Sequence, residues 1–173
     1  LKKETPEAQW ASLPARYALV EVVNLHDDAL TFEPIHRVLF HVDGQDLWAA
    51  FRAFYPAAHT GAGAGHTVEV CGQGLDGAWT VPAPSAQLAV GTLQAFLDDY
   101  CKRRPEVEID YIHGDDVARK LGGQPGNLGF LLPSMGKDQL FRTVMADGVL
   151  PRKTFSMGEA QDKRYYLEAR KIR

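Results

Sequence analysis

The chain has 173 residues, of which 45% are apolar and 24% charged, and its formal net charge is −3. This length suits one domain that buries roughly 68–70% of its unfolded surface, and the apolar content argues against disorder. No run approaches the ~18 apolar residues of a membrane helix, so we expect no membrane as a partner. Two cysteines are too few for a disulfide scaffold and no signal peptide is recognisable, which together indicate a cytoplasmic protein.

The charge is unevenly distributed along the chain. Residues 1–149 carry 12 basic and 19 acidic side chains, a net of −7, whereas residues 150–173 carry 7 basic and 3 acidic ones, a net of +4. A basic end on an acidic body indicates an anion site, a partner contact or a final strand paired with acidic neighbours. An acidic chain without a ladder of basic and aromatic residues argues against nucleic acid as a partner.

The first half of the chain predicts strands and one helix. Residues 1–15 are polar and punctuated by proline, which indicates a tail or a lead-in helix before one domain over 16–173. Residues 17–25 are rich in β-branched residues and apolar on both faces except at Glu21 and Asn24, which is typical of a central strand. The alternation over 37–42 predicts a second strand. Further elements are a helix from Asp46 to Pro56 and a glycine-turn hairpin formed by 67–71 and 78–81.

The second half predicts more helices. Ser85 is the expected N-cap of the longest helix, which ends before Pro105. Strict alternation predicts a strand over 106–112, and an apolar run predicts a buried strand over 128–132. Between them a short helix begins near Asp115, and this connection is long enough for a crossover between parallel strands. The remaining elements are an amphipathic helix over 138–147, with Leu140, Phe141, Val144 and Met145 apolar and Gly148 as C-cap, and a final strand over 164–172.

The mixed order of these elements predicts an α+β fold. We expect a single compact domain in which three to four helices pack on a mixed β-sheet.

Two clusters place an imidazole beside carboxylates at the end of a predicted strand: His26-Asp27-Asp28 and His113-Gly114-Asp115-Asp116. Carboxylates suit Mg²⁺, which makes Asp115 and Asp116 candidate metal ligands. The alternative is a surface turn and a helix N-terminus, where aspartate is favoured anyway. None of the six histidines has the spacing that specifies a metal site.

Two further segments carry groups suited to anions. In Glu33-Pro34-Ile35-His36-Arg37 the alternation directs His36 and Arg37 to opposite faces, where the arginine can bind phosphate and the histidine can move a proton. The alternative is that Arg37 pairs with an acidic neighbour and His36 packs in the core. The second segment, residues 151–158, can hold phosphate through Arg152, Lys153, Thr154 and Ser156, although it lacks the P-loop spacing.

Covalent catalysis finds little support in the sequence. No serine lies in a nucleophile elbow, Cys101 falls on a buried helix, and nothing marks Cys71 as activated.

Several blocks resemble the DUF1015 family of uncharacterised proteins. They are Phe32-Glu-Pro-Ile-His-Arg-Val-Leu39, Tyr111-Ile-His-Gly114, Gly129-Phe-Leu-Leu-Pro133, Leu150-Pro-Arg-Lys-Thr-Phe-Ser-Met-Gly158 and Lys163-Arg-Tyr-Tyr-Leu-Glu168. The resemblance implies kinship with the ParB/sulfiredoxin-like superfamily, which includes nucleotide-using enzymes and small-molecule kinases. It also implies that a glycine–histidine–histidine–arginine segment lies upstream of Leu1, so we expect a C-terminal portion whose partners include that N-terminal region.

The resemblance strengthens the anion-site interpretation, because the polar blocks fall on the same residues. Our leading hypothesis is a phosphate- or nucleotide-binding pocket of a phosphoryl-transfer enzyme, with His36 and His113 handling protons and Arg37, Arg152, Lys153, Thr154 and Ser156 binding the small anionic ligand. A nucleotide with Mg²⁺ on Asp115 and Asp116 is the expected cofactor. The alternative is a non-catalytic structural or oligomerisation domain, in which a homodimer is one arrangement.

Overall fold

The computed structural model describes residues 4–13, 20 and 22–158 of the chain. A short 3₁₀ helix, η1 (Glu7–Ser12), precedes the domain. The elements of the domain are β1 (Phe32–Phe40), α1 (Gly44–Phe54), β2 (His59–Thr60), β3 (His66–Cys71), β4 (Gly77–Val81), α2 (Ala89–Arg103), β5 (Glu108–His113), α3 (Asp115–Gly122), β6 (Leu128–Leu131), α4 (Gln139–Asp147) and β7 (Phe155–Met157).

The described strands form a sheet in the order β2-β4-β3-β6-β1-β5, and β7 pairs with the first residues of β1. The α+β class predicted from the sequence is therefore confirmed. Each pairing in the described sheet is antiparallel, which refines the expectation of a mixed sheet. Because β5 and β6 each pair antiparallel with β1, which lies between them, these two strands run in the same direction, as the crossover prediction required.

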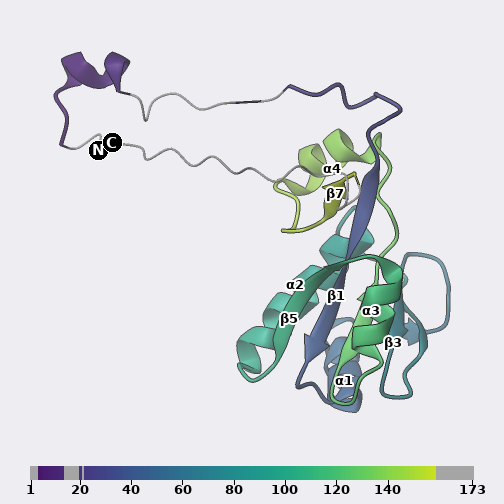
Figure 1. Ribbon diagram of the computed structural model, residues 1–173. Helices are drawn as coiled ribbons and strands as arrows, with labels where there is room; N and C mark the ends of the chain where they lie inside the picture. The colour runs from purple at the N-terminus through teal and green to yellow at the C-terminus, as the bar shows by residue number, and fades with distance from the viewer. Residues whose placement is uncertain (1–3, 14–19, 21, 159–173) are drawn as a thin grey trace.

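Helices cover both faces of the sheet (Figure 1), and side chains of β1 take part in the core on each face. On one face Leu39 belongs to the large core with residues of α1 and α2, including Phe51 and Phe96. On the other face Val38 packs with Cys71 and with Ala118 of α3. This alternation along β1 decides the geometry of every polar group described below, because successive side chains of a strand point to opposite faces.

The approach of α3 to the sheet depends on residues without side chains. A Cβ atom at Gly129 would lie 2.6 Å from the Sγ of Cys71 and 3.2 Å from the carbonyl oxygen of Ala118. A Cβ atom at Gly122 would lie 2.6 Å from the backbone nitrogen of Gly129. Glycine at both positions therefore brings the last turn of α3 against β6.

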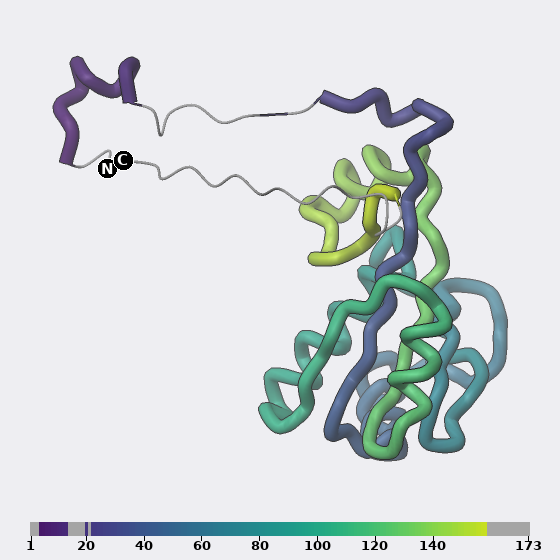
Figure 2. The backbone as a smooth tube through the Cα atoms, in the orientation of Figure 1, coloured from purple at the N-terminus to yellow at the C-terminus, as the bar shows by residue number. Residues whose placement is uncertain are grey.

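The N-terminal end of β1 is held by segments from late in the chain (Figure 2). Pro34 is the register partner of Phe155, and the Phe32 and Phe155 rings stack with centroids 4.1 Å apart. From the segment after β6, the Ser134 hydroxyl donates a hydrogen bond to the carbonyl oxygen of Phe32 at 3.1 Å.

Several elements differ from the sequence predictions. The strand predicted over 37–42 is β1, which begins earlier, at Phe32, and ends at Phe40. Helix α2 begins at Ala89, and its N-cap is Leu88, which provides no side-chain hydrogen bond, so the prediction of Ser85 as N-cap was wrong. Within the predicted strand over 17–25, the described residues are not in a strand, and Val22 is 95% exposed. The rest of that stretch and the predicted strand over 164–172 lie outside the described residues.

Helix α4 occurs where the sequence predicted it and ends at Gly148, the expected C-cap, whose φ is 82°. Its apolar side is largely uncovered in the described structure. Phe141 is 64% exposed and Met145 is 86% exposed, whereas Thr143 is buried. Within the described residues no helix is both long enough and apolar enough to traverse a membrane.

Candidate functional site

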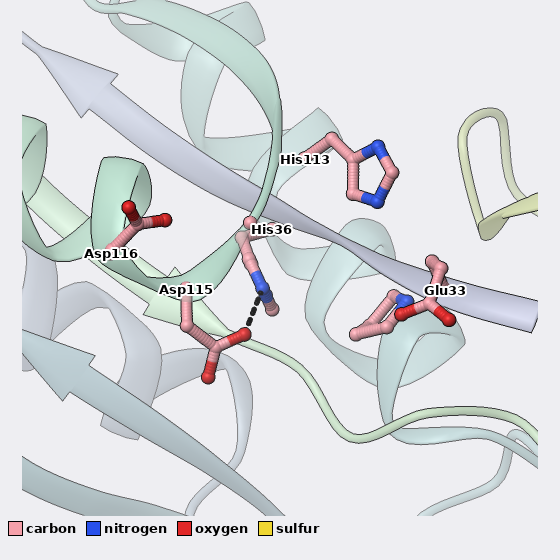
Figure 3. Close-up of a pocket in the computed structure, with 7 residues that line it drawn as sticks. Glu33, His36, His113, Asp115 and Asp116 are labelled. Carbon is pink, nitrogen blue, oxygen red and sulfur yellow. Dashed lines mark hydrogen bonds and ion pairs between the residues drawn. The ribbon is translucent and has the colours of Figure 1, made fainter. Parts of the chain in front are cut away.

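A pocket of about 290 Å³ opens where the N-terminal part of β1 meets the connection between β5 and α3 (Figure 3). Two of the predicted site histidines and both predicted metal ligands lie here. The residues that line the pocket are Glu33, Pro34, His36, His113, Gly114, Asp115 and Asp116. The structure therefore gathers five side chains that can exchange protons.

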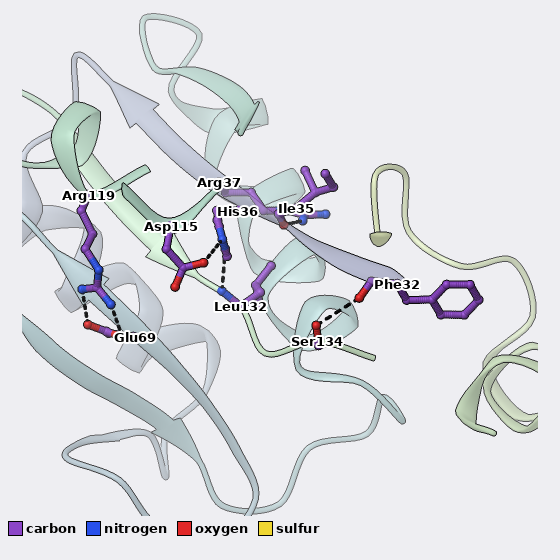
Figure 4. Close-up of polar contacts among 9 residues, drawn as sticks. All are labelled: Phe32, Ile35, His36, Arg37, Glu69, Asp115, Arg119, Leu132 and Ser134. Carbon is purple, nitrogen blue, oxygen red and sulfur yellow. Dashed lines mark hydrogen bonds and ion pairs between the residues drawn. The ribbon is translucent and has the colours of Figure 1, made fainter. Parts of the chain in front are cut away.

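The centre of this pocket is a hydrogen bond between a buried histidine and an exposed aspartate (Figure 4). His36 Nε2 lies 2.9 Å from Asp115 Oδ1, and the backbone N–H of Leu132 donates to His36 Nδ1 at 3.1 Å. Because Nδ1 accepts a hydrogen bond, the proton of the neutral ring is on Nε2, from which it is donated to the Asp115 carboxylate. Both ring nitrogens of His36 are therefore engaged.

Burial keeps His36 neutral. Its side chain is 1% exposed, and desolvation lowers the pKa of the imidazole, while the hydrogen bond that it donates to the Asp115 carboxylate raises this pKa. The nearby charges of Arg37 and His113 lower the pKa of His36 further. A neutral, doubly engaged imidazole is suited to hold a neighbouring group in place.

Asp115 is the group of this pair that a ligand can reach. Its side chain is 66% exposed, at the first residue of α3, where the backbone N–H groups favour negative charge. The carboxylate groups of Asp115, Asp116 and Glu33 could each offer oxygen atoms to Mg²⁺. However, no group of three or more His, Cys, Asp or Glu side chains among the described residues is arranged to hold a metal ion. A bound Mg²⁺ would therefore need additional oxygens from a ligand, as is usual for this ion.

Arg37 lies on the opposite face of β1 from His36, as the alternation predicted. Its guanidinium is fully buried and donates to the carbonyl oxygen of Ile35, to Gln94 Oε1 at 3.2 Å and to the carbonyl oxygen of Arg152 at 3.0 Å. Desolvation lowers the pKa of Arg37 to about 10. Arg37 therefore does not face the histidine pocket, and the structure does not bring the predicted cations and histidines into one site.

The remaining predicted anion ligands spread along the segment that leads into β7. Arg152 reaches the ring of Tyr111, with its Cζ 5.4 Å from the ring centroid, on the same side of β1 as Arg37. Lys153 is exposed and has a φ of 54°. The Thr154 hydroxyl bonds the carbonyl oxygen of Pro151, and Ser156 is the register partner of Glu33.

Sequence reasoning did not single out three residues around Arg37: Gln94, Asp98 and Tyr111. Gln94 lies within the apolar stripe of α2, and this polar interruption was the signal that could have located a buried partner. The other predicted His–Asp cluster, at residues 26–28, forms a turn in which Asp27 accepts from the backbone N–H of Ala29.

Together these features define an α+β domain with a pocket of titratable side chains at the start of β1 and a separate arginine cluster across the sheet. A family model described as "Protein of unknown function (DUF1015)" matches residues 1–171. The match covers almost the whole chain, so the chain belongs to the DUF1015 family. The searches of curated proteins and of solved structures gave no match, and kinship with the ParB/sulfiredoxin-like superfamily stays a prediction.

Proposed function

We propose that the domain contributes the proton-accepting pocket of an enzyme that transfers a phosphoryl group to a small hydroxyl-bearing substrate. Asp115 would accept the proton as the O–H bond of the substrate breaks. The substrate oxygen would bond to the terminal phosphorus of a nucleotide, and the bond from that phosphorus to the departing nucleoside diphosphate would break. His36 is then a positioning residue, in place of the catalytic role expected from the sequence.

The observation that carries this proposal is the hydrogen bond between buried His36 and exposed Asp115. Its donor, His36 Nε2–H, is fixed by the second bond at Nδ1, so one carboxylate oxygen is oriented while the other is available to a ligand. A carboxylate that accepts the proton of the attacking hydroxyl is a recurring element of phosphoryl transfer. His113 lies close enough to affect the protonation of His36 and completes the lining.

The charge of the lining indicates in which form a nucleotide would bind. Three carboxylates and no lysine or arginine are among the residues that line the pocket. This acidic lining would repel the phosphates of a nucleotide without a metal ion, whereas it would attract a nucleotide whose phosphates carry a bound Mg²⁺. Asp116, beside Asp115, would supply one carboxylate oxygen to the ion, the nucleotide phosphates would have to supply further oxygens, and the ion would neutralise phosphate charge there.

The test is a thermal-shift and calorimetric titration of the 173-residue chain with ATP, in MgCl₂ and separately in EDTA. We expect wild type to bind only the Mg²⁺ complex and to release ADP slowly when glycerol is the acceptor. Asp116→Asn should weaken binding, and Asp115→Asn should abolish ADP release. Asp28→Asn, at the other predicted His–Asp cluster, is the matched control and should behave as wild type. Absence of Mg²⁺-dependent binding in wild type, or unchanged ADP release in Asp115→Asn, would refute the proposal.

The second candidate is a docking role without catalysis, and the exposed apolar side of α4 favours it. Phe141, Val144 and Met145 lie on that side, and Val149 just beyond the helix is 95% exposed. Apolar groups gathered in this way are typical of interaction surfaces. If a second copy of the chain covers them, light scattering after size exclusion will give a dimer mass for wild type and a monomer mass for Met145→Glu. A monomeric wild type would exclude the homodimer.

A further inference from the structure

Arg37 belongs to a closed ring of polar contacts on the face of the sheet that carries α2. Arg37 donates to Gln94 Oε1 at 3.2 Å, and Gln94 Nε2 donates to Asp98 Oδ1 at 2.8 Å. Asp98 Oδ1 lies 3.6 Å from a terminal nitrogen of Arg152. The backbone carbonyl of Arg152 accepts a hydrogen bond from Arg37 at 3.0 Å, which closes the ring. Residues from β1, from α2 and from the segment before β7 are thus fixed in relation to one another.

The charges in this ring do not cancel. Two arginines and one aspartate leave a net charge of +1, and Asp98 contacts the exposed Arg152, not the buried Arg37. The described hydrogen-bond partners of Arg37 are neutral: two carbonyl oxygens and an amide. A buried cation without an ionised partner is costly, so a site of this kind gains from a nearby anion.

A wide-open surface cavity of about 610 Å³ lies beside the ring, between α2 and residues 149–152. On the α2 side the lining includes the small residues Gly91 and Ala95, which leave space for a ligand. Gln94, Asp98 and Arg152 supply polar groups to the wall. Both guanidinium groups lie near the ring of Tyr111, with the Arg37 Cζ 5.0 Å and the Arg152 Cζ 5.4 Å from its centroid. This cation–π arrangement restricts the Arg152 side chain, although 66% of it is exposed.

We propose that this cavity is a binding site for a small oxyanion such as a phosphate monoester, distinct from the histidine pocket. Arg152 makes the direct contact, and the buried charge of Arg37 attracts the ligand through the hydrogen-bonded ring. The long Arg152–Asp98 pair is weak enough to open, because an exposed ion pair of this length contributes little stability. An anion with more than one oxygen can bind the guanidinium in a bidentate way. This proposal does not depend on the function of Asp115.

Inorganic phosphate is the probe, titrated into ¹⁵N-labelled chain at constant ionic strength, with chloride as the reference. We expect saturable shifts of the Gln94 side-chain amide and of the Arg152 backbone amide. Arg152→Gln should weaken binding about tenfold, the loss of one charge-assisted contact. Asp98→Asn keeps an acceptor for Gln94 but removes the competing charge, so it should tighten binding a few-fold.

Arg142→Gln is the matched control, because Arg142 is also an exposed arginine in a long ion pair, 3.8 Å from Asp138, but lies outside this cavity. It should leave phosphate binding unchanged, and so should Asp115→Asn, which separates this proposal from that of the histidine pocket. Linear, non-saturating shifts in wild type would overturn the proposal. So would an equal loss of affinity in Arg152→Gln and Arg142→Gln.

Discussion

Replacing His36 by leucine tests the central contact of the histidine pocket. Leucine has a similar volume but cannot accept the hydrogen bond from the backbone N–H of Leu132, which is buried. An unsatisfied buried donor costs about 1–3 kcal/mol. The lost contact with Asp115 adds little, because that carboxylate is well exposed and returns to water. At about 2–4 °C per kcal/mol for a chain of this size, we expect the Tm of His36→Leu to fall by roughly 2–12 °C.

The assay is urea unfolding at pH 7.5, followed by circular dichroism, together with a thermal melt. Asp115→Asn is the control, because it keeps an acceptor for His36 Nε2–H and should change the free energy of unfolding by less than about 1 kcal/mol. If His36→Leu unfolds at the same urea concentration as wild type, the bond from Leu132 to the imidazole contributes no stability and the reasoning fails.

The same variant reports on the protonation of His36. Burial lowers the pKa of the folded imidazole below 6.5, its value in the unfolded chain. Below that pH the unfolded state binds a proton that the folded state does not bind, so stability declines as the pH falls from about 6.5 toward the folded pKa. His66 contributes in the same direction in both proteins, because burial lowers its pKa too. The Tm of His36→Leu should therefore fall less than that of wild type between pH 7.5 and 5.

Three other substitutions have calculable outcomes, each measured by urea unfolding. Gly129→Ala places a Cβ 2.6 Å from the Cys71 Sγ and should cost about 1–3 kcal/mol, part of which Cys71→Ala in the same chain should restore. Tyr100→Phe removes the 2.8 Å hydrogen bond to Asp46 Oδ2 and should cost about 0.5–1.5 kcal/mol. Glu69→Gln breaks the exposed ion pair with Arg119 and should cost less than about 1 kcal/mol, with a smaller difference in high salt. Equal effects of Gly129→Ala and Glu69→Gln would contradict the packing argument.

Local patterns were enough to locate most elements of the fold. Alternation found β1 and β5, helical spacing found α1, and glycine marked the end of α4. The N-terminus of α2 was misplaced because a serine before an apolar stripe resembles an N-cap, whereas here Leu88 occupies the cap and its side chain is buried in the core.

Predicting which residues share a site required knowing which face of the sheet each residue occupies. Alternation correctly assigned His36 and Arg37 to opposite faces, and this already argued against one pocket that contains both. The pairing of His36 with Asp115 required the register of β1 against β5, and the contact of Arg37 with Gln94 required the packing of α2. Neither can be inferred from spacing along the chain.

The arrangement around β1 also has a consequence for synthesis. The ribosome delivers this strand before β5, β6 and β7, which pair with it and all belong to the second half of the sequence. The β3–β4 hairpin, by contrast, can close as soon as it emerges. An apolar strand with two open edges is prone to pair with the wrong chain. Until β5 has been made both edges of β1 lack their native partners, and until β6 has been made one of them still does, so slow elongation would prolong that risk.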